Sequence, residues 1–164
     1  IAAINGRSSG GGAEIGWACD LRFAEEKATF SQPEVDLNLT TGLGGTSRVV
    51  KLIGATHTAE LIFGGKEFTA NKMYNLGSIN EVVKNGTSLE YSINWANELS
   101  RKPKEALSSL KTILKKSMDI PLGESLRNEQ EIFQSIVSSD NAINKMREIQ
   151  NRYFKGEKPI DIDY

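Results

Sequence analysis

The sequence predicts an α/β domain followed by a helical region, with the change near residue 84. Before this residue, short apolar runs of strand length alternate with helical patterns and glycine turns, as in packed layers of strands and helices. After it, apolar residues recur at helical spacing only. With 164 residues, of which 38% are apolar and 25% charged, the chain is long enough to bury a core. We expect an α/β core over residues 1–84 and a helical region over residues 85–164.

Four short apolar runs in the first part predict strands, at Ile1–Ile4, Leu21–Ala24, Ala28–Phe30 and Ile79–Val83. After the first of them, Gly10–Gly12 predicts a turn that opens a helix. The first N–H groups of a helix have no partners within it. They attract negatively charged oxygen atoms, so this turn is a candidate binding site.

The second part predicts four helices. In each, the apolar residues keep to one helical face, and Pro103 and Pro121 mark breaks between helices. The four faces consist of Leu89, Ile93, Ala96 and Leu99; Leu107, Leu110, Leu114 and Met118; Leu122, Leu126, Phe133 and Val137; and Ile143, Met146, Ile149 and Tyr153. We expect these faces to pack on the chain's own domain or on a neighbouring subunit.

Composition argues against several classes of protein. The 20 Lys and Arg residues nearly balance the 21 Asp and Glu residues, so no global charge recruits nucleic acid or an anionic membrane. One Cys and one His cannot form an internal disulfide or a Zn site with the usual ligands. No apolar run approaches the roughly 20 residues that span a bilayer. The glycines at 42–45 and 64–65 lack the spacing of nucleotide-binding motifs.

Two glutamates in glycine-rich and apolar settings, Glu14 and Glu34, are the strongest chemical signal. Each alone has an ordinary structural explanation. Glu14 falls in the first turn of a predicted helix, where the dipole favours a carboxylate, and Glu34 follows Pro33, as at many helix starts. Together, 20 residues apart, they predict a pair of carboxyl groups that act as acid and base.

Six blocks in order carry a family resemblance: Ile1–Gly6, Gly10–Glu14, Cys19–Arg22, Phe30–Glu34, Gly42–Arg48 and Leu76–Val83. Through them the chain resembles the enoyl-CoA hydratase/isomerase family, the crotonase superfamily. The resemblance implies a crotonase-like (ClpP/crotonase) fold of ββα units, with a carboxy-terminal helical region that forms trimers and covers the active site. Because the chain starts on a mid-sheet strand of that fold, without Met, we expect it to be N-terminally truncated.

The resemblance also implies roles for individual residues. Glu14 would activate water, Glu34 would donate a proton to C2 of the substrate, and the Gly11 amide would contribute to the oxyanion hole. Further substrate-binding positions would be Gly10, Pro33, Gly42 and Leu43. No metal and no cofactor is implied, apart from the coenzyme A that the substrate itself carries.

Retention of both glutamates favours a hydratase, which adds water across the 2,3 double bond of a 2-enoyl-CoA thioester to give a 3-hydroxyacyl-CoA. An isomerase of the same family that relies on Glu34, and a non-catalytic binding or assembly module, are alternatives. The implied partners are an acyl-CoA or acyl-carrier-protein thioester and further copies of the chain, as a homotrimer or a dimer of trimers. The implied compartment is the cytoplasm, with the mitochondrial matrix as an alternative.

Some positions depart from the family pattern. Asp36 and Asn38 replace parts of a Gly-Leu-Gly segment, and Thr41 stands where Pro is common, which predicts a more polar or reshaped acyl pocket. By the resemblance, Thr46 opens the helix that follows the glycine-rich segment, and a role as helix cap explains it at least as well as a role in the site. Lysines form a basic face that is either solvated or near the phosphates of coenzyme A: Lys111, Lys115 and Lys116, with Lys155 and Lys158 as further candidates.

Overall fold

The computed structural model describes residues 1–158. Its contacts divide the chain into two compact units, Ile1–Glu98 and a second that begins at Leu99. The first unit holds all the strands of the described residues, and the last of these ends at Val83. The helix that follows, α4 (Ser88–Ser100), lies almost wholly in the first unit. The domain boundary expected at residue 84 stays a prediction.

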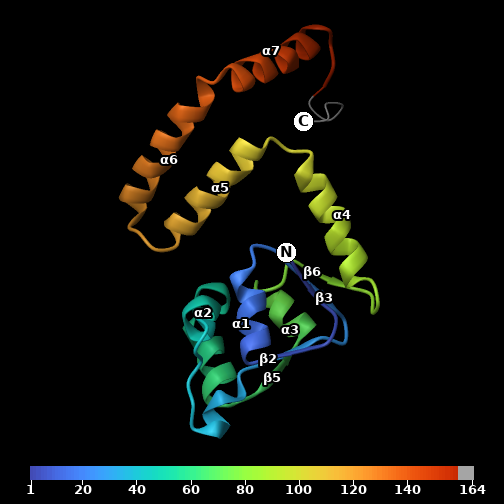
Figure 1. The fold of residues 1–164 in the computed structure, drawn as a ribbon, viewed down its shortest axis with the longest axis vertical. Coiled ribbons are helices and arrows are strands. Elements are labelled where there is room, and N and C mark those ends of the chain that lie inside the picture. Colours follow the sequence, from blue (N-terminus) through green and yellow to red (C-terminus); the bar gives the residue numbers. More distant parts are fainter. Residues whose placement is uncertain (159–164) are drawn as a thin grey trace. The chain divides into compact units, whose positions relative to one another are not determined.

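Two small sheets organise the first unit (Figure 1). One has the parallel order β1-β3-β6 and consists of β1 (Ala2–Ile4), β3 (Arg22–Glu25) and β6 (Glu81–Val83). The other has the order β2-β4-β5, in which β2 (Arg7–Ser9) pairs parallel with β4 (Thr29–Ser31) and β4 pairs antiparallel with β5 (Glu67–Thr69). The four predicted strands are confirmed. The polar β2 and β5, each with one buried residue, gave no apolar run to detect.

The chain passes twice from the first sheet to the second, once from β1 to β2 and once from β3 to β4. A helix follows each passage. After β2 comes α1 (Gly11–Ala18), and after β4 come the 3₁₀ helix η1 (Pro33–Leu37) and α2 (Gly45–Phe63). The remaining helix between strands is α3 (Ala70–Asn75). This repetition of two strands and a helix agrees with the expected ββα units.

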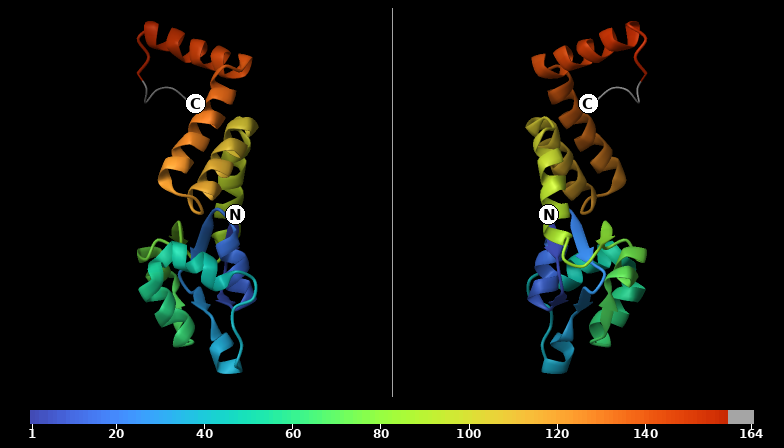
Figure 2. Two further views of the ribbon diagram at one scale, coloured as in Figure 1. Left: turned by 90° about the vertical axis from the view of Figure 1, so that its left-hand side faces the viewer. Right: turned by 90° about the vertical axis from the view of Figure 1, so that its right-hand side faces the viewer.

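The core of the first unit lies between the helices and the sheets, and α1 packs along α2 (Figure 2). Its buried apolar side chains come from strands of both sheets and from α1, α2 and α3, among them Ile4, Trp17, Phe30, Val49, Leu61, Phe68 and Met73. Gly54 breaks α2 with a positive φ of 75°, a conformation that glycine adopts without strain. The core thus fixes α1 against α2, and the candidate site lies where these two helices begin.

Arg22, in β3, forms hydrogen bonds with the end of α1 and with the segment before β6. Its guanidinium group is buried and donates from Nε to the Ser78 carbonyl oxygen at 2.6 Å and from Nη1 to the carbonyl oxygens of Gly16 and Cys19. The last carbonyl groups of a helix have no partners within it, so Arg22 supplies a donor to the Cys19 carbonyl oxygen and a second donor to the Gly16 carbonyl oxygen, which also accepts from the Cys19 N–H. Burial lowers the pKa of Arg22, while Cys19 and Asp20 oppose that change.

Up to residue 158, the second unit contains three helices of its own, α5 (Lys104–Ser117), α6 (Leu122–Val137) and α7 (Asp140–Phe154). Pro103 and Pro121 directly precede α5 and α6, which confirms the expected breaks. The predicted helices are therefore present, but many side chains of their apolar faces are exposed, including Leu110, Leu114, Leu122, Leu126, Phe133 and Met146. Among residues 1–158, no helix combines the length and apolarity needed to cross a membrane.

A buried carboxylate joins the end of β3 to the start of α4. Glu25 is only 2% exposed, and its Oε1 accepts from the Ser88 hydroxyl at 2.9 Å while its Oε2 lies 3.1 Å from Lys27 Nζ. The backbone of Gly86 contributes most to lowering the pKa of Glu25 to about 2, burial opposes the shift, and Lys27 and Ser88 add to it. The ionised form is therefore stabilised in the folded state.

The pKa shift of Glu25 predicts a specific acid sensitivity. Because its pKa falls from 4.5 to about 2 on folding, the stabilisation is fully present above about pH 4.5 and is lost as pH falls toward 2. Glu25→Gln should lower the free energy of unfolding at pH 7. It should also make that free energy decrease less steeply as the pH falls from about 4.5 toward 2. Urea unfolding across that range measures both effects, and Glu26→Gln on the exposed neighbour is the control. A pH dependence identical to that of the unsubstituted chain would contradict the assignment.

Candidate active site

The site forms where α1 begins, at the ends of β2 and β4. The Gly10 N–H donates to the Ser31 carbonyl oxygen at 2.9 Å, so the pairing of the two strands continues to the first turn of α1. Gly10 is the residue before the helix and has φ of 54°, in the left-handed region that favours glycine. Gly11 is the first helical residue, and its N–H belongs to the group that the helix leaves without internal partners.

Glu14 reaches from the first turn of α1 to the start of α2. Its side chain is 3% exposed, and its Oε1 accepts from the Gly45 N–H at 2.7 Å and from the Leu43 N–H at 3.1 Å. Two backbone donors on one carboxylate oxygen fix the orientation of the group. The contact also explains Gly45, because a Cβ there would lie 2.6 Å from Glu14 Oε1.

Glu34 approaches the same helix start from η1. It is half-buried, and its Oε1 lies 2.9 Å from the position that a Cβ on Gly10 would occupy. Only glycine at position 10 accepts both this approach and the positive φ. Because Glu14 lies one helical turn beyond Gly10, the two predicted acid/base residues come to the same end of α1.

The structure also places the other residues singled out in the sequence. Leu43 packs over Gly11, since its Cδ1 lies 3.5 Å from the position of a Cβ on that glycine. Pro33 opens η1 directly before Glu34. Gly42 precedes Leu43, with open space around the position of a Cβ. The catalytic and binding roles of these residues stay predictions.

A network of hydrogen bonds holds the loop that supplies the donors to Glu14. Thr41 Oγ1 lies 2.8 Å from Thr46 Oγ1 and accepts from the Thr46 N–H at 3.2 Å. The Arg48 guanidinium donates to the Leu43 carbonyl oxygen across Gly44, where φ is 87°. The expected role of Thr46 as a helix cap is wrong, because Gly44 occupies the cap position and Thr46 lies inside α2.

Two departures from the family pattern have structural explanations. Asn38 ends η1 in the left-handed conformation, with φ of 55°, which Asn tolerates better than most residues with a Cβ. Asp36 Oδ2 lies 2.8 Å from the position of a Cβ on Gly65. Asp36 therefore packs at the loop after α2. Whether the acyl pocket is more polar stays a prediction.

Gln32 and Gly45 belong to the site, although the sequence gave no signal that singled them out. Gln32 is 1% exposed, and with its amide nitrogen toward Glu34 it donates to both carboxylate oxygens, at 2.7 and 2.8 Å. Because buried glutamine is uncommon, the sequence alone would place a polar side chain at the end of β4 on the surface. Gly45 looks like an ordinary member of a glycine-rich loop until the position of Glu14 is known.

The arrangement supports acid/base chemistry beside a site for a developing negative charge. Two carboxyl groups can exchange protons with one bound molecule. The N–H groups at the start of α1 can stabilise an oxygen atom that becomes negatively charged during a reaction.

A family model described as enoyl-CoA hydratase/isomerase matches residues 1–156. A short-chain-enoyl-CoA hydratase from Clostridium acetobutylicum is 33% identical over 96% of this chain and 61% of its own length. A 2,3-dehydroadipyl-CoA hydratase from Escherichia coli K12 is 30% identical over 85% of this chain and 55% of its own. The crystal structure of an enoyl-CoA hydratase from Bacillus anthracis superposes with a TM-score of 0.87 at 28% identity, covering 93% of this chain and 59% of that one. The matched part is thus about three-fifths of each relative or less, and the fold is crotonase-like.

Gly45→Ala tests the contact between α1 and α2. Its Cβ would fall 2.6 Å from Glu14 Oε1 and 2.9 Å from the Gln32 amide, and crowding of a packed site costs about 1–3 kcal/mol. We expect urea unfolding to show a loss of this size. Gly123→Ala in α6, where the nearest atom is 4.0 Å away, is the matched control and should be neutral or slightly stabilising. Equal stabilities for the two variants would rule out the close approach at Gly45.

Proposed function

The chain belongs to the enoyl-CoA hydratase/isomerase family, and from that premise we propose that it acts as an enoyl-CoA hydratase. The proposed reaction is the reversible addition of water to the 2,3 double bond of a 2-enoyl-CoA thioester. The observation that carries this proposal is the meeting of Glu14 and Glu34 at the start of α1, next to the Gly11 amide.

Each residue has one role in the proposed mechanism. Glu14 removes a proton from water as the water oxygen bonds to C3 of the substrate. Glu34 gives a proton to C2, so one proton leaves water and one enters the product. Between these events the thioester carbonyl oxygen carries enolate-like negative charge, which the Gly11 N–H at the start of α1 stabilises.

The backbone donors to Glu14 support its proposed role as the residue that activates water. The Gly45 and Leu43 N–H groups hold Glu14 Oε1 in place, so the carboxylate does not need to reorganise before it accepts a proton. Glu34 lies on the short η1 helix and is more accessible, which suits a group that must meet the substrate carbon.

The proposed substrate is an acyl-CoA thioester, with an acyl-carrier-protein thioester as the alternative carrier. Gly10, Pro33, Gly42 and Leu43 would line the space for the thioester and acyl group. The exposed Leu43 side chain offers apolar surface beside Gly11. The mechanism uses no cofactor other than the coenzyme A that the substrate carries. We place the reaction in the cytoplasm, or in the mitochondrial matrix, because the matched relatives include bacterial and mitochondrial proteins.

Substitution of each glutamate separates hydration from isomerisation. In the natural full-length chain, Glu14→Gln should lower hydration of crotonyl-CoA by about 100-fold or more, the usual loss on removal of an acid/base group. Glu34→Gln should have an effect of similar size. The absorbance of the conjugated enoyl thioester measures hydration, and the exposed Glu131→Gln on α6 is the control. Full hydration by Glu14→Gln would contradict the mechanism, and retained movement of a double bond would favour an isomerase.

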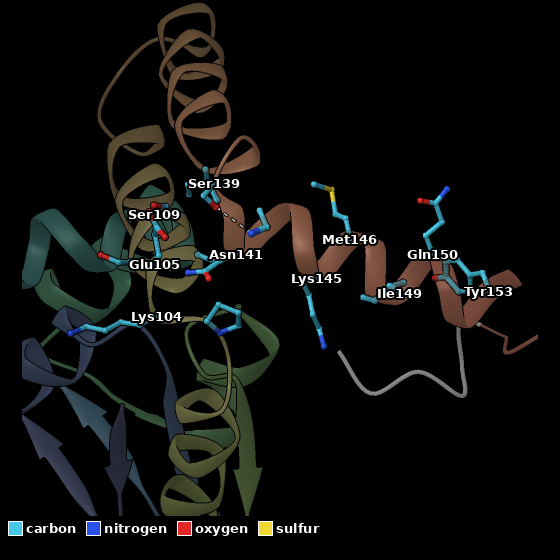
Figure 3. Close-up of a pocket in the computed structure, with 15 residues that line it drawn as sticks. Lys104, Glu105, Ser109, Ser139, Asn141, Lys145, Met146, Ile149, Gln150 and Tyr153 are labelled. Carbon is cyan, nitrogen blue, oxygen red and sulfur yellow. Dashed lines mark hydrogen bonds between the residues drawn. The ribbon is translucent and has the colours of Figure 1, made fainter. Parts of the chain in front are cut away.

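The proposal includes assembly into a homotrimer or a dimer of trimers. A cavity of about 1130 Å³ opens between the start of α5 and α7 (Figure 3). Apolar side chains from both helices line it, including Ala106, Met146, Ile149 and Tyr153. Met146 is 50% exposed and Tyr153 is 41% exposed. Apolar surface of this kind is typical of an interface between subunits.

A charge placed in this cavity should weaken assembly. Met146→Glu would put a carboxylate among apolar side chains, where burial without a partner is costly. We expect sedimentation equilibrium to show a shift of the full-length chain from trimer toward monomer. Asn144→Glu adds the same charge at an exposed position of α7 that does not line the cavity. An unchanged mass for Met146→Glu, or an equal shift for both variants, would show that this cavity is not the interface.

A further inference from the structure

We infer that Asn85 is a site of deamidation, and that its turn and the buried carboxylate of Glu25 slow this reaction in the folded chain. The site is the pair Asn85-Gly86, which lies between the end of β6 and the start of α4. Both residues are exposed, so water reaches them. The inference does not depend on the proposed function, because neither residue takes part in the proposed mechanism.

The reaction follows from the two residue types, since Asn is chemically labile. The Gly86 nitrogen loses its proton to a base and bonds to Cγ of Asn85, while the bond from Cγ to Nδ2 breaks and ammonia leaves with a proton. Water then opens the succinimide ring and leaves either Asp or an isoaspartyl residue at this position. Glycine after Asn favours ring closure, because it has no side chain to crowd the nitrogen and its backbone turns freely.

A closed turn holds the two residues in place. The N–H and the hydroxyl group of Thr87 both donate to the Lys84 carbonyl oxygen, at 3.1 and 2.8 Å. Gly86 has φ of 86°, which glycine adopts without strain. The Asn85 side chain is tied to the segment after β3, because its Oδ1 accepts from the Lys27 N–H at 3.0 Å. These bonds restrict the torsion angles through which Cγ and the Gly86 nitrogen can meet.

The carboxylate of Glu25 protects the nitrogen that would attack. Its side chain is 2% exposed, and its Oε1 accepts at 2.9 Å from the hydroxyl group of Ser88, two residues after Gly86. The Gly86 N–H also donates to this carboxylate and contributes most to lowering the pKa of Glu25. The attack requires that N–H to lose its proton, and a second negative charge beside an ionised carboxylate is disfavoured.

Deamidation would in turn weaken the contacts that slow it. An isoaspartyl residue lengthens the main chain by a side-chain carbon atom, so the hydrogen bond from Thr87 to Lys84 would lose its register. Either product adds a negative charge close to Glu25, where like charges repel. The modification would therefore loosen the start of α4, whose first residue, Ser88, donates to Glu25.

Peptide mapping by mass spectrometry tests the site in the full-length chain. Replacement of the Asn85 amide by a carboxyl group raises the mass of its peptide. We expect Asn85 to convert in guanidinium chloride, and about tenfold or more slowly in the folded protein, because a hydrogen bond to a charged group must first break. No conversion in the denaturant, or equal rates in the two states, would overturn the inference.

Glu25→Gln separates local protection from the stability of the whole fold. The sequence holds a second such pair, Asn5-Gly6, between β1 and β2, and unfolding of the whole unit exposes both pairs alike. We expect Glu25→Gln to raise the folded-state rate at Asn85 about tenfold or more relative to the rate at Asn5. Glu26→Gln on the exposed neighbour should leave this ratio unchanged. An equal rise at both sites in Glu25→Gln would overturn the inference.

Hydrogen exchange of the Gly86 N–H tests the same contact without any substitution, and it decides the matter if Glu25→Gln does not fold. Base-catalysed exchange removes the same proton that deamidation removes. A donor held by a buried carboxylate should exchange slowly, although Gly86 itself is exposed. Exchange at the rate of an unstructured amide would show that Glu25 does not protect this nitrogen and would overturn the inference.

Discussion

The hydrogen bonds from the Gly45 and Leu43 N–H groups to Glu14 are the interaction on which the site depends. They join the first turn of α1 to the first turn of α2, across 31 residues of chain. This close approach requires glycine at position 45, because any Cβ would meet the carboxylate. It also requires a rigid loop before α2, which Arg48 and the pair of threonines at 41 and 46 provide. The position of one carboxylate thus explains the glycine at position 45, and the loop before α2 supplies backbone donors to it.

The other half of the site depends on strand pairing. Because β2 and β4 pair in parallel and the Gly10 N–H continues that pairing to Ser31, the residues after β4 must lie beside the start of α1. Gln32 and Glu34 are therefore brought to the Gly10 turn by backbone hydrogen bonds that do not depend on their own side chains. Arg22 secures the far end of α1. The helix that carries Glu14 is consequently held at both ends.

The sequence predicted those strands and helices whose formation depends on the pattern of neighbouring residues. The apolar runs gave β1, β3, β4 and β6, and the helical periodicity with two prolines gave α4 to α7. The pair Glu14 and Glu34 was found because family blocks surround it, and the structure brings both residues to one helix start. Gln32 and Gly45 were not found, because their roles arise only from contacts with Glu34 and Glu14 through space. Both residues lie inside the family blocks Phe30–Glu34 and Gly42–Arg48, but a block in a single sequence does not show which of its residues makes such contacts.

The two units differ in what they bury. The first unit buries an apolar core together with polar side chains such as Arg22 and Glu25, whereas in the second unit α5 and α7 have no buried residue and large apolar side chains are exposed along α5, α6 and α7. Isolated helices of 14 to 16 residues are marginal in water and gain most of their stability from packing of an apolar face. The contacts to Glu14 come from Gly45 and Leu43, within the first unit. The acid/base geometry and the apolar surface of the second unit therefore depend on separate sets of residues, and each can be altered by substitutions that leave the other's contacts in place.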